Sequence, residues 1–315
     1  MTDVVIALDV GGTVIKSALV TADGTLGQVR RHPTDAHRGS DAVIETILDL
    51  TVELADAARA DGLRPRAAGV AVPGVVDEEA GVAVWSANLG FRNLALRDLV
   101  AGQVGLPTVL AHDVRAGGLA EARVGAGRDS RHVLFLAIGT GIAAAHVVDG
   151  VVLTGAHSAA GEIGHVIVRP EGPVCGCGGR GCLEAVASAA AVARRYAAVA
   201  GSPATAAEVA ARAASGDRTA ADVWHEAVEA LADGLLTGLA LVDPEIVVIG
   251  GGMSEAGDQL LDPLRSAVRR RLTFHYEPRL VRAALGDKAG CLGAGLLALG
   301  HRESGRPESV EAALR

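Results

Sequence analysis

The sequence predicts an α/β protein with two domains, and three observations support this prediction. The chain has 315 residues, which is more than one ordinary domain contains. Hydrophobic residues make up 50% of it but aromatic residues only 2%, so small aliphatic side chains would fill the cores. Segments typical of strands and helices alternate along the chain, and one order of segments occurs twice, which suggests a duplicated domain.

The first half begins with the pattern of a β-hairpin. Residues 3–10 and 14–20 are two apolar strands, and the residues between them read Gly-Gly-Thr. A segment with helical periodicity follows at 41–61, and an apolar strand at 67–72 ends at a Pro-Gly pair. These patterns predict strand, strand, helix and strand in that order.

The hairpin pattern returns near the middle of the chain. A strand at 108–112 and a helix at 115–124 come first, and then strands at 132–138 and 142–148 flank a Gly-Thr-Gly turn. This is the opening order of strand, Gly/Thr turn and strand again.

The second half ends in helices. A stretch rich in Gly and Cys at 170–182 precedes helical segments that run to about 242. A buried strand is expected at 245–249 and a last Ala/Leu helix near 290–300, whereas the polar residues 301–315 are expected to fray.

Charge and hydropathy exclude two classes of partner. The formal net charge is −8 and the basic residues are spread along the chain, so no nucleic-acid surface is expected. No apolar run approaches the roughly 20 residues that span a bilayer, and the chain starts without a basic signal-peptide flank. We therefore expect a cytoplasmic protein that binds neither a membrane nor a nucleic acid.

The first hairpin turn has the residues of a phosphate-binding loop. Glycine lets a backbone approach an anion closely, a Thr hydroxyl and a Lys ammonium add donors, and an Asp can bind magnesium through water. These residues are Asp9, Gly11, Gly12, Thr13 and Lys16. The alternative is a hairpin turn that only requires glycine.

Two further glycine turns strengthen the nucleotide interpretation. Gly139, Thr140 and Gly141 form a second turn of the same kind, which would hold the phosphates together with the first. Gly251 and Gly252 follow a buried strand and would approach the nucleoside.

Three cysteines and one histidine predict a metal site. His165, Cys175, Cys177 and Cys182 are a tetrahedral ligand set with glycines between the cysteines, and four protein ligands leave no position for catalysis. We expect a structural zinc; the alternative is reduced cysteines that bind nothing.

Carboxylates flank this metal set. Glu162 lies three residues before His165 and Glu184 two residues after Cys182, so the metal would fix both. Carboxylates accept hydrogen bonds from adjacent sugar hydroxyls, and a metal-bound imidazole can donate from its second nitrogen. The alternative for each glutamate is a solvated surface position.

Asp113 is the candidate general base. It follows a strand and begins a helix, and phosphoryl transfer to an alcohol needs a carboxylate that accepts the hydroxyl proton. The alternative is a helix N-cap, a position where Asp is common.

Taken together, these motifs resemble the ROK family of bacterial sugar kinases, and its glucokinases in particular, from residue 4 to about 300. The resemblance rests on Asp9-Val10-Gly11-Gly12-Thr13 with Lys16, Gly139-Thr140-Gly141, Glu162-Ile163-Gly164-His165 and Cys175-Gly-Cys177-Gly-Gly-Arg-Gly-Cys182-Leu-Glu184.

The resemblance implies an actin-like ATPase (ribonuclease H-like) fold with two duplicated domains and a cleft between them. A small α/β domain would comprise residues 1–111, joined by the C-terminal helix at about 299–315, and a large α/β domain with the zinc knot would comprise 112–298. It also implies ATP with Mg²⁺, a hexose substrate and a homodimer or homotetramer.

Roles for single residues follow from the same resemblance. Asp113 would be the catalytic base, and the sugar would contact Asn88, His112, Asp113, Glu162, His165 and Glu184. The chain departs from the family at two places. His112 and Arg115 replace the Asn residues around the base, and Ala143–Ala145 stand where further glycines are frequent.

The resemblance implies ATP-dependent phosphorylation of glucose to glucose 6-phosphate. Alternatives are a kinase for mannose, fructose or N-acetylmannosamine, and a sugar sensor with weak catalysis, which the two departures favour. A transcriptional regulator of the family, which would carry a DNA-binding domain ahead of this fold, is disfavoured, since only a few residues precede the first strand and the net charge is negative.

Overall fold

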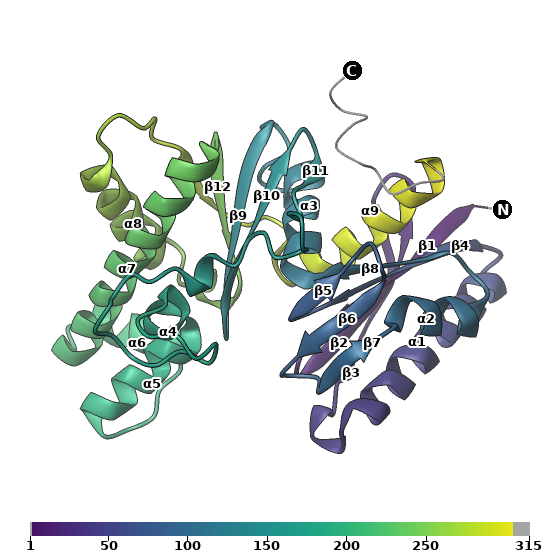
Figure 1. Cartoon of the computed structure of the whole chain (residues 1–315), viewed down its shortest axis with the longest axis horizontal. Coiled ribbons are helices and arrows are strands. Elements are labelled where there is room, and N and C mark those ends of the chain that lie inside the picture. The colour runs from purple at the N-terminus through teal and green to yellow at the C-terminus, as the bar shows by residue number, and fades with distance from the viewer. Residues whose placement is uncertain (1, 305–315) are drawn as a thin grey trace. The chain divides into compact units, whose positions relative to one another are not determined.

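The chain folds into two compact units, each built on a β-sheet (Figure 1). The structure is a computed structural model that describes residues 2–304. The first unit comprises the described residues up to Val124, Val151–Ala160 and those from Asp287 onward. The second comprises Gly125–Gly150 and Gly161–Gly286.

The sheet of the first unit has the strand order β3-β2-β1-β4-β8. β1 pairs antiparallel with β2 and parallel with β4, and β4 pairs parallel with β8. The strands are β1 (Asp3–Val10), β2 (Val14–Thr21), β3 (Leu26–Pro33), β4 (Arg64–Val72) and β8 (Thr108–His112).

Helices cover both faces of this sheet, with α1 and α2 on one side and α9 on the other (Figure 1). α9 also packs against α3. The helical segments of this unit are η1 (Ala36–Arg38), α1 (Ser40–Ala60), α2 (Leu96–Val104), α3 (Asp113–Val124) and α9 (Ala289–Ser304). A short segment, η4 (Gly286–Lys288), begins at the last residue of the second unit and leads into α9.

The alternation of side chains along β1 places Asp9 on the face of the sheet that α9 covers. Successive residues of a strand point to opposite faces. Ile6 and Leu8 are fully buried in the same cluster as Ile47 and Leu54 of α1. Asp9 therefore belongs to the other face, where α9 begins.

A small three-stranded sheet is inserted between β4 and β8. It has the order β5-β6-β7, with strands β5 (Val75–Asp77), β6 (Val82–Ser86) and β7 (Phe91–Leu94). Its turns bring two polar residues toward the first sheet: Glu78 follows β5, and Asn88 lies between β6 and β7.

The second unit repeats the topology of the first, as the sequence predicts. β9 pairs antiparallel with β10 and parallel with β12, and β12 pairs parallel with β13. The order β10-β9-β12-β13 thus matches β2-β1-β4-β8. These strands are β9 (His132–Ile138), β10 (Ile142–Val148), β12 (Ile246–Gly250) and β13 (Arg279–Arg282), and β11 (Val151–Val152) follows β10 in the chain.

The long helix α7 is the centre of the second core. Leu231 and Leu235 are buried in one cluster with Leu136 of β9 and Val247 of β12. Ser188, Thr205 and Asp217 cap the helices that follow them. The helical segments are η2 (Ile163–His165), α4 (Leu183–Ala187), α5 (Ala189–Ala200), α6 (Ala206–Ala214), α7 (Arg218–Val242), η3 (Gly252–Ala256) and α8 (Asp258–Arg271).

The expected strands and helices agree with the structure within a few residues, and β3, α2, β11, α8, β13 and the three-stranded sheet are additions to them. The structure groups α3 and all of α9 with the first unit. The domains expected from the resemblance instead divide at 111/112 and at 298/299, and that division stays a prediction. The expected fraying at 301–315 lies mostly outside the described residues, although α9 extends to Ser304.

Within the described part of the chain, the helices are too short or too polar to cross a bilayer.

Candidate active site and metal centre

The turn between β1 and β2 brings the first group of predicted residues together. Asp9 and Lys16 are directly opposite in the β1–β2 pairing, and Lys16 Nζ lies 3.3 Å from Asp9 Oδ2. The Gly11 N–H donates to the Val14 carbonyl at 3.0 Å and closes the turn. The carboxylate and the glycine backbone therefore occupy one end of the sheet.

The first turn of α9 lies directly against Asp9. A Cβ atom built on Gly290 would be 2.7 Å from the Asp9 Cγ, so no larger residue fits at this position. The N-terminus of a helix carries a partial positive charge, which favours a carboxylate nearby. No motif in the sequence marks Gly290, because it lies in a Gly/Ala/Leu helix far along the chain.

The carboxyl of Asp9 is shifted toward its protonated form. Burial raises its pKa to about 6, and the charge and hydrogen bond of Lys16 oppose this rise while the charge of Asp113 adds to it. A cation bound at this carboxylate would lower the pKa again, because it stabilises the ionised form.

Thr34 supports the turn and was also missed. It is 1% exposed, and its hydroxyl donates to the Gly11 carbonyl at 2.6 Å while its N–H donates to the Thr13 carbonyl at 2.9 Å. These two bonds orient the carbonyls of Gly11 and Thr13 toward Thr34. No local motif marks this residue in the sequence.

Asn88 lies next to the same turn. A Cβ built on Gly12 would be 3.2 Å from the Asn88 Cβ, and the Asn88 side chain is exposed. The structure thus brings this predicted sugar-binding residue next to the first predicted phosphate turn.

Asp113 begins α3, directly after β8. Its Oδ1 accepts a hydrogen bond from the Val114 N–H at 2.7 Å and lies 3.4 Å from His112 Nδ1. Burial raises the pKa of the Asp113 carboxyl, and the Val114 N–H and the charges of Arg115 and Lys16 oppose that rise. A carboxylate with a raised pKa is a better proton acceptor once it is ionised, as a general base requires.

Glu78 is a further polar neighbour that sequence reasoning missed. Its Oε1 accepts hydrogen bonds from the His112 N–H at 3.0 Å and from Arg115 Nε at 2.7 Å. It therefore contacts the residue before Asp113 and the residue two positions after it. It stands in an Asp-Glu-Glu run, which in sequence is indistinguishable from a solvated surface.

The second glycine turn is held by the residues that follow the cysteines. The Gly139 N–H donates to the Gly141 carbonyl at 2.9 Å, and the Gly139 carbonyl accepts from the Ala189 N–H at 2.8 Å. Glu184 Oε2 accepts from the Ile142 N–H at 3.0 Å, and a Cβ on Gly141 would lie 2.5 Å from that oxygen. Glu184, predicted to bind sugar, thus also contacts the predicted phosphate turn.

The alanines after this turn belong to strand β10. Ala143, Ala144 and Ala145 pair with residues of β9, and the side chains of Ala144 and Ala145 are buried. Their position in a paired strand indicates that these alanines pack within the sheet.

Gly251 and Gly252 follow β12 and begin η3. Gly251 has a φ of 76°, and a Cβ on it would lie 2.5 Å from the Ile138 carbonyl oxygen. These glycines therefore lie beside the end of β9, one residue before the Gly139 turn.

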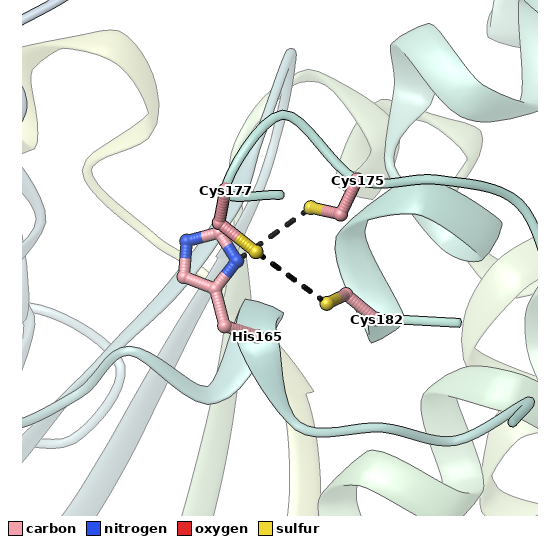
Figure 2. A group of neighbouring side chains, drawn as sticks. All are labelled: His165, Cys175, Cys177 and Cys182. Atoms are coloured by element: carbon pink, nitrogen blue, oxygen red, sulfur yellow. Dashed lines mark hydrogen bonds between the residues drawn. The ribbon is translucent and has the colours of Figure 1, made fainter. Parts of the chain in front are cut away.

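The cysteines and histidine predicted as metal ligands form one cluster (Figure 2). Their ligand atoms all lie within 4.8 Å of one another. His165 ends η2 and lies 3.7 Å from the Cys175 sulfur through Nδ1, and the Cys177 and Cys182 sulfurs are 3.7 Å apart. A Cys₃His set of this size fits a tetrahedral zinc ion.

The electrostatics of the cluster also fit a cation. Burial and the neighbouring sulfurs raise the pKa of the Cys182 thiol to about 12. A divalent cation would offset this cost, because it binds the thiolate. His165 Nε2, on the other side of the ring, lies 3.8 Å from Glu162 Oε2.

Comparison with known proteins adds independent evidence. The model of the ROK family matches residues 5–301. The chain is 37% identical to a glucokinase of Thermotoga maritima over 92% of this chain and 95% of that protein. It is 34% identical to an N-acetylmannosamine kinase of Citrobacter koseri, over 94% and 99% of the two chains.

A solved structure extends the likeness to the fold. The ROK family glucokinase of Streptomyces griseus, in complex with glucose and AMPPNP, matches with a TM-score of 0.80 and 30% identity, over 94% of this chain and 99% of that one. With the motifs, the duplicated sheet topology and the Cys₃His cluster, these matches show that the chain belongs to the ROK family and has its actin-like fold.

Proposed function

We propose that this protein is an ATP-dependent sugar kinase that transfers a phosphoryl group to a hexose, with glucose as the first candidate and glucose 6-phosphate as its product. The observation that carries the proposal is the environment of Asp113: a carboxylate at the start of a helix, with a raised pKa, in the same unit as the Asp9–Lys16 turn. The kinase names of the relatives support the reaction class.

In the proposed reaction, Asp113 accepts the proton of the attacking hydroxyl. The hydroxyl oxygen forms a bond to the γ-phosphorus of ATP, and the bond from that phosphorus to the bridging oxygen breaks, so that ADP leaves. Positioning and charge stabilisation provide most of the catalysis in such transfers.

The nucleotide is assigned to the glycine turns. Backbone N–H groups of Gly11, Gly12 and Gly139–Gly141 would contact phosphate oxygens, with the Thr13 and Thr140 hydroxyls and Lys16 as further donors. Gly251 and Gly252 would approach the nucleoside. Asp9 would bind Mg²⁺ through water, and the ion would neutralise charge on the β- and γ-phosphates.

The sugar is assigned to Asn88, His112, Glu162, His165 and Glu184, together with the base. His165 supports this assignment, because Nδ1 faces the cysteines and Nε2 stays available on the Glu162 side. Glu184 has one oxygen bonded to Ile142, which leaves its other oxygen as an acceptor for a hydroxyl.

The cluster of His165, Cys175, Cys177 and Cys182 is proposed to hold a structural zinc. Four protein ligands fill a tetrahedral shell, so the ion would contribute folding free energy and fixed geometry rather than chemistry. A homodimer or homotetramer and a cytoplasmic location also stay predictions.

Two other candidates keep specific support. The N-acetylmannosamine kinase relative supports an amino sugar or another hexose, such as mannose or fructose, as substrate. His112 and Arg115, which replace amides beside the base, favour a sugar sensor with weak catalysis.

The test is ADP release by the purified protein with ATP and Mg²⁺ against glucose, mannose, fructose, N-acetylglucosamine and N-acetylmannosamine, with a control that contains no sugar. Sugar-dependent release supports the kinase and identifies its substrate. Calorimetric binding of glucose without release from any sugar would instead support the sensor.

A further inference from the structure

Arg115 is a buried arginine whose guanidinium donates hydrogen bonds to several acceptors. Its side chain is 2% exposed. Nε donates to Glu78 Oε1 at 2.7 Å, and Nη1 donates to the Ser158 carbonyl at 3.0 Å and the Ala160 carbonyl at 3.4 Å. Nη2 lies 3.5 Å from the Val76 carbonyl. One carboxylate and three carbonyls thus compensate the desolvation of this charge, as a buried ion requires.

These contacts connect three segments of the first unit that are far apart in sequence. Arg115 lies in the first turn of α3, Val76 and Glu78 lie in or after β5, and residues 158–160 precede Gly161 in the chain. The oxygen of Glu78 that accepts from Arg115 also accepts from the His112 N–H. One carboxylate therefore bonds the backbone just before Asp113 and the side chain of Arg115 just after it.

We propose that Arg115 is a positioning residue: with Glu78 it fixes the backbone that carries Asp113 and holds residues 158–160 against the start of α3. The inference depends on the proposed function, because Asp113 has a role as general base only if the protein is a kinase. Lysine could not replace this role fully, since its single ammonium lacks the planar set of donors that a guanidinium directs toward several acceptors.

The charge of Arg115 has a second effect on the base. The charged groups that face Asp113 are Arg115, Lys16, Asp9 and, at 3.4 Å, His112 Nδ1. Burial raises the pKa of Asp113, whereas Arg115 and Lys16 lower it. Removal of the Arg115 charge alone should therefore raise this pKa, so that the base ionises at a higher pH than in the wild type.

The experiment compares the full-length wild-type protein with Arg115→Gln, Arg115→Lys and Glu78→Gln. Arg265→Lys is the matched control, because Arg265 also bonds a carbonyl, that of Leu280 at 2.9 Å, and a carboxylate, that of Asp262 at 2.7 Å, but in α8. The readouts are kcat and KM for both substrates, the pH dependence of kcat/KM, the melting temperature, and amide hydrogen exchange of residues 151–165.

For Arg115→Gln we expect kcat to fall about 10-fold or more and the KM for ATP to change less than about 2-fold. The acidic limb of the pH profile should move to higher pH, and residues 156–161 should exchange faster. Arg115→Lys should keep the wild-type acidic limb, because it keeps the charge, but should lose part of kcat. Glu78→Gln should lower kcat without moving the limb.

Two results would overturn the inference. One is a folded Arg115→Gln protein with wild-type kcat, pH profile and exchange. The other, if that variant does not fold, is wild-type kcat and exchange in both Arg115→Lys and Glu78→Gln. If the wild-type protein were inactive with every sugar, the proposed function would be rejected, and this inference would be rejected with it. The activity of the wild type therefore distinguishes the two failures.

Discussion

Glu184 Oε2 accepts a hydrogen bond from the backbone N–H of Ile142, the first residue after the Gly139–Gly141 turn, at 3.0 Å. Glu184 is also two residues from Cys182, whose sulfur is buried in the Cys₃His cluster. The Cys₃His cluster and the second glycine turn are thus connected by the residue that carries this carboxylate. A residue assigned to the sugar therefore also supports the turn assigned to the nucleotide.

This contact predicts different effects for two substitutions of Glu184. Glu184→Gln keeps a carbonyl oxygen for the Ile142 N–H but loses the charge, so it should raise the KM for the sugar more than the KM for ATP. Glu184→Ala loses both functions and should raise both values, by about 10-fold or more for a charged hydrogen bond worth about 1.5–3 kcal/mol. Steady-state kinetics with each substrate varied checks this.

Glu171→Ala is the control for Glu184, because Glu171 is exposed in the segment that leads to the cysteines. It should leave both KM values unchanged. Equal KM values for ATP in Glu184→Ala and in the wild type would show that the turn does not need this hydrogen bond.

Asp113→Asn should separate catalysis from binding. The amide keeps the shape of the side chain but cannot accept the proton, so kcat should fall by about 10²–10⁴, the usual contribution of a general base. Sugar affinity, measured by calorimetry, should change little.

Asp98→Asn is the matched control for the base, since the Asp98 side chain is 67% exposed. It should behave as the wild type does. If Asp113→Asn retained wild-type turnover, the proton acceptor would have to be another group.

Much of the fold could be predicted because its strands are apolar and bounded by glycines. β1, β8, β9 and β10 begin and end where the pattern places them, and their repeated Gly/Thr turns reveal the duplication. β3 alternates intermediate and exposed residues and has no buried side chain, so it gives no such pattern. β5, β6 and β7 have three to five residues each, which is too short for periodicity.

The candidate site was predictable only where a local motif marks it. The four predicted metal ligands lie within 18 consecutive residues, and the structure brings them together as expected. Thr34 and Glu78 reach Gly11 and Arg115 only through tertiary folding, across 23 and 37 positions. In the sequence Arg115 is visible only as a departure from the family. The three carbonyls that it contacts come together only in the folded chain.

The metal centre predicts that Cys177→Ser lowers both zinc content and stability. A structural metal binds the folded state, so its loss removes folding free energy. Elemental analysis of the purified protein should show about one zinc per chain in the wild type, as a single tetrahedral Cys₃His site requires, and less in the variant, with a lower melting temperature. A strong chelator should have the same effect on the wild type.

Cys291 supplies the control for the metal centre. It lies outside the cluster, and its thiol donates to the Ala7 carbonyl at 3.4 Å in the first unit. Cys291→Ala should keep the zinc content. An unchanged melting temperature in Cys177→Ser, with zinc absent, would argue against a structural metal.

The raised pKa of Asp9 predicts that this residue costs stability at neutral pH. The unfolded chain releases the proton near the ordinary pKa of 3.8, whereas the folded chain keeps it until about pH 6. The folded state therefore binds more protons between these values, and the free energy of unfolding falls as the pH rises through this window. The difference corresponds to about 3 kcal/mol at most.

Asp9→Asn should remove this cost. Its free energy of unfolding should exceed that of the wild type by up to about 3 kcal/mol at pH 7.5 and by almost nothing at pH 3.5. Denaturant unfolding at several pH values, without nucleotide or magnesium, measures the difference, and Asp98→Asn is again the exposed control. The same variant should lose turnover, because an amide binds Mg²⁺ less well than a carboxylate does. A constant difference across the pH range would mean that the Asp9 carboxyl does not titrate in this window, and that α9 and Lys16 stabilise its charge more than burial opposes it.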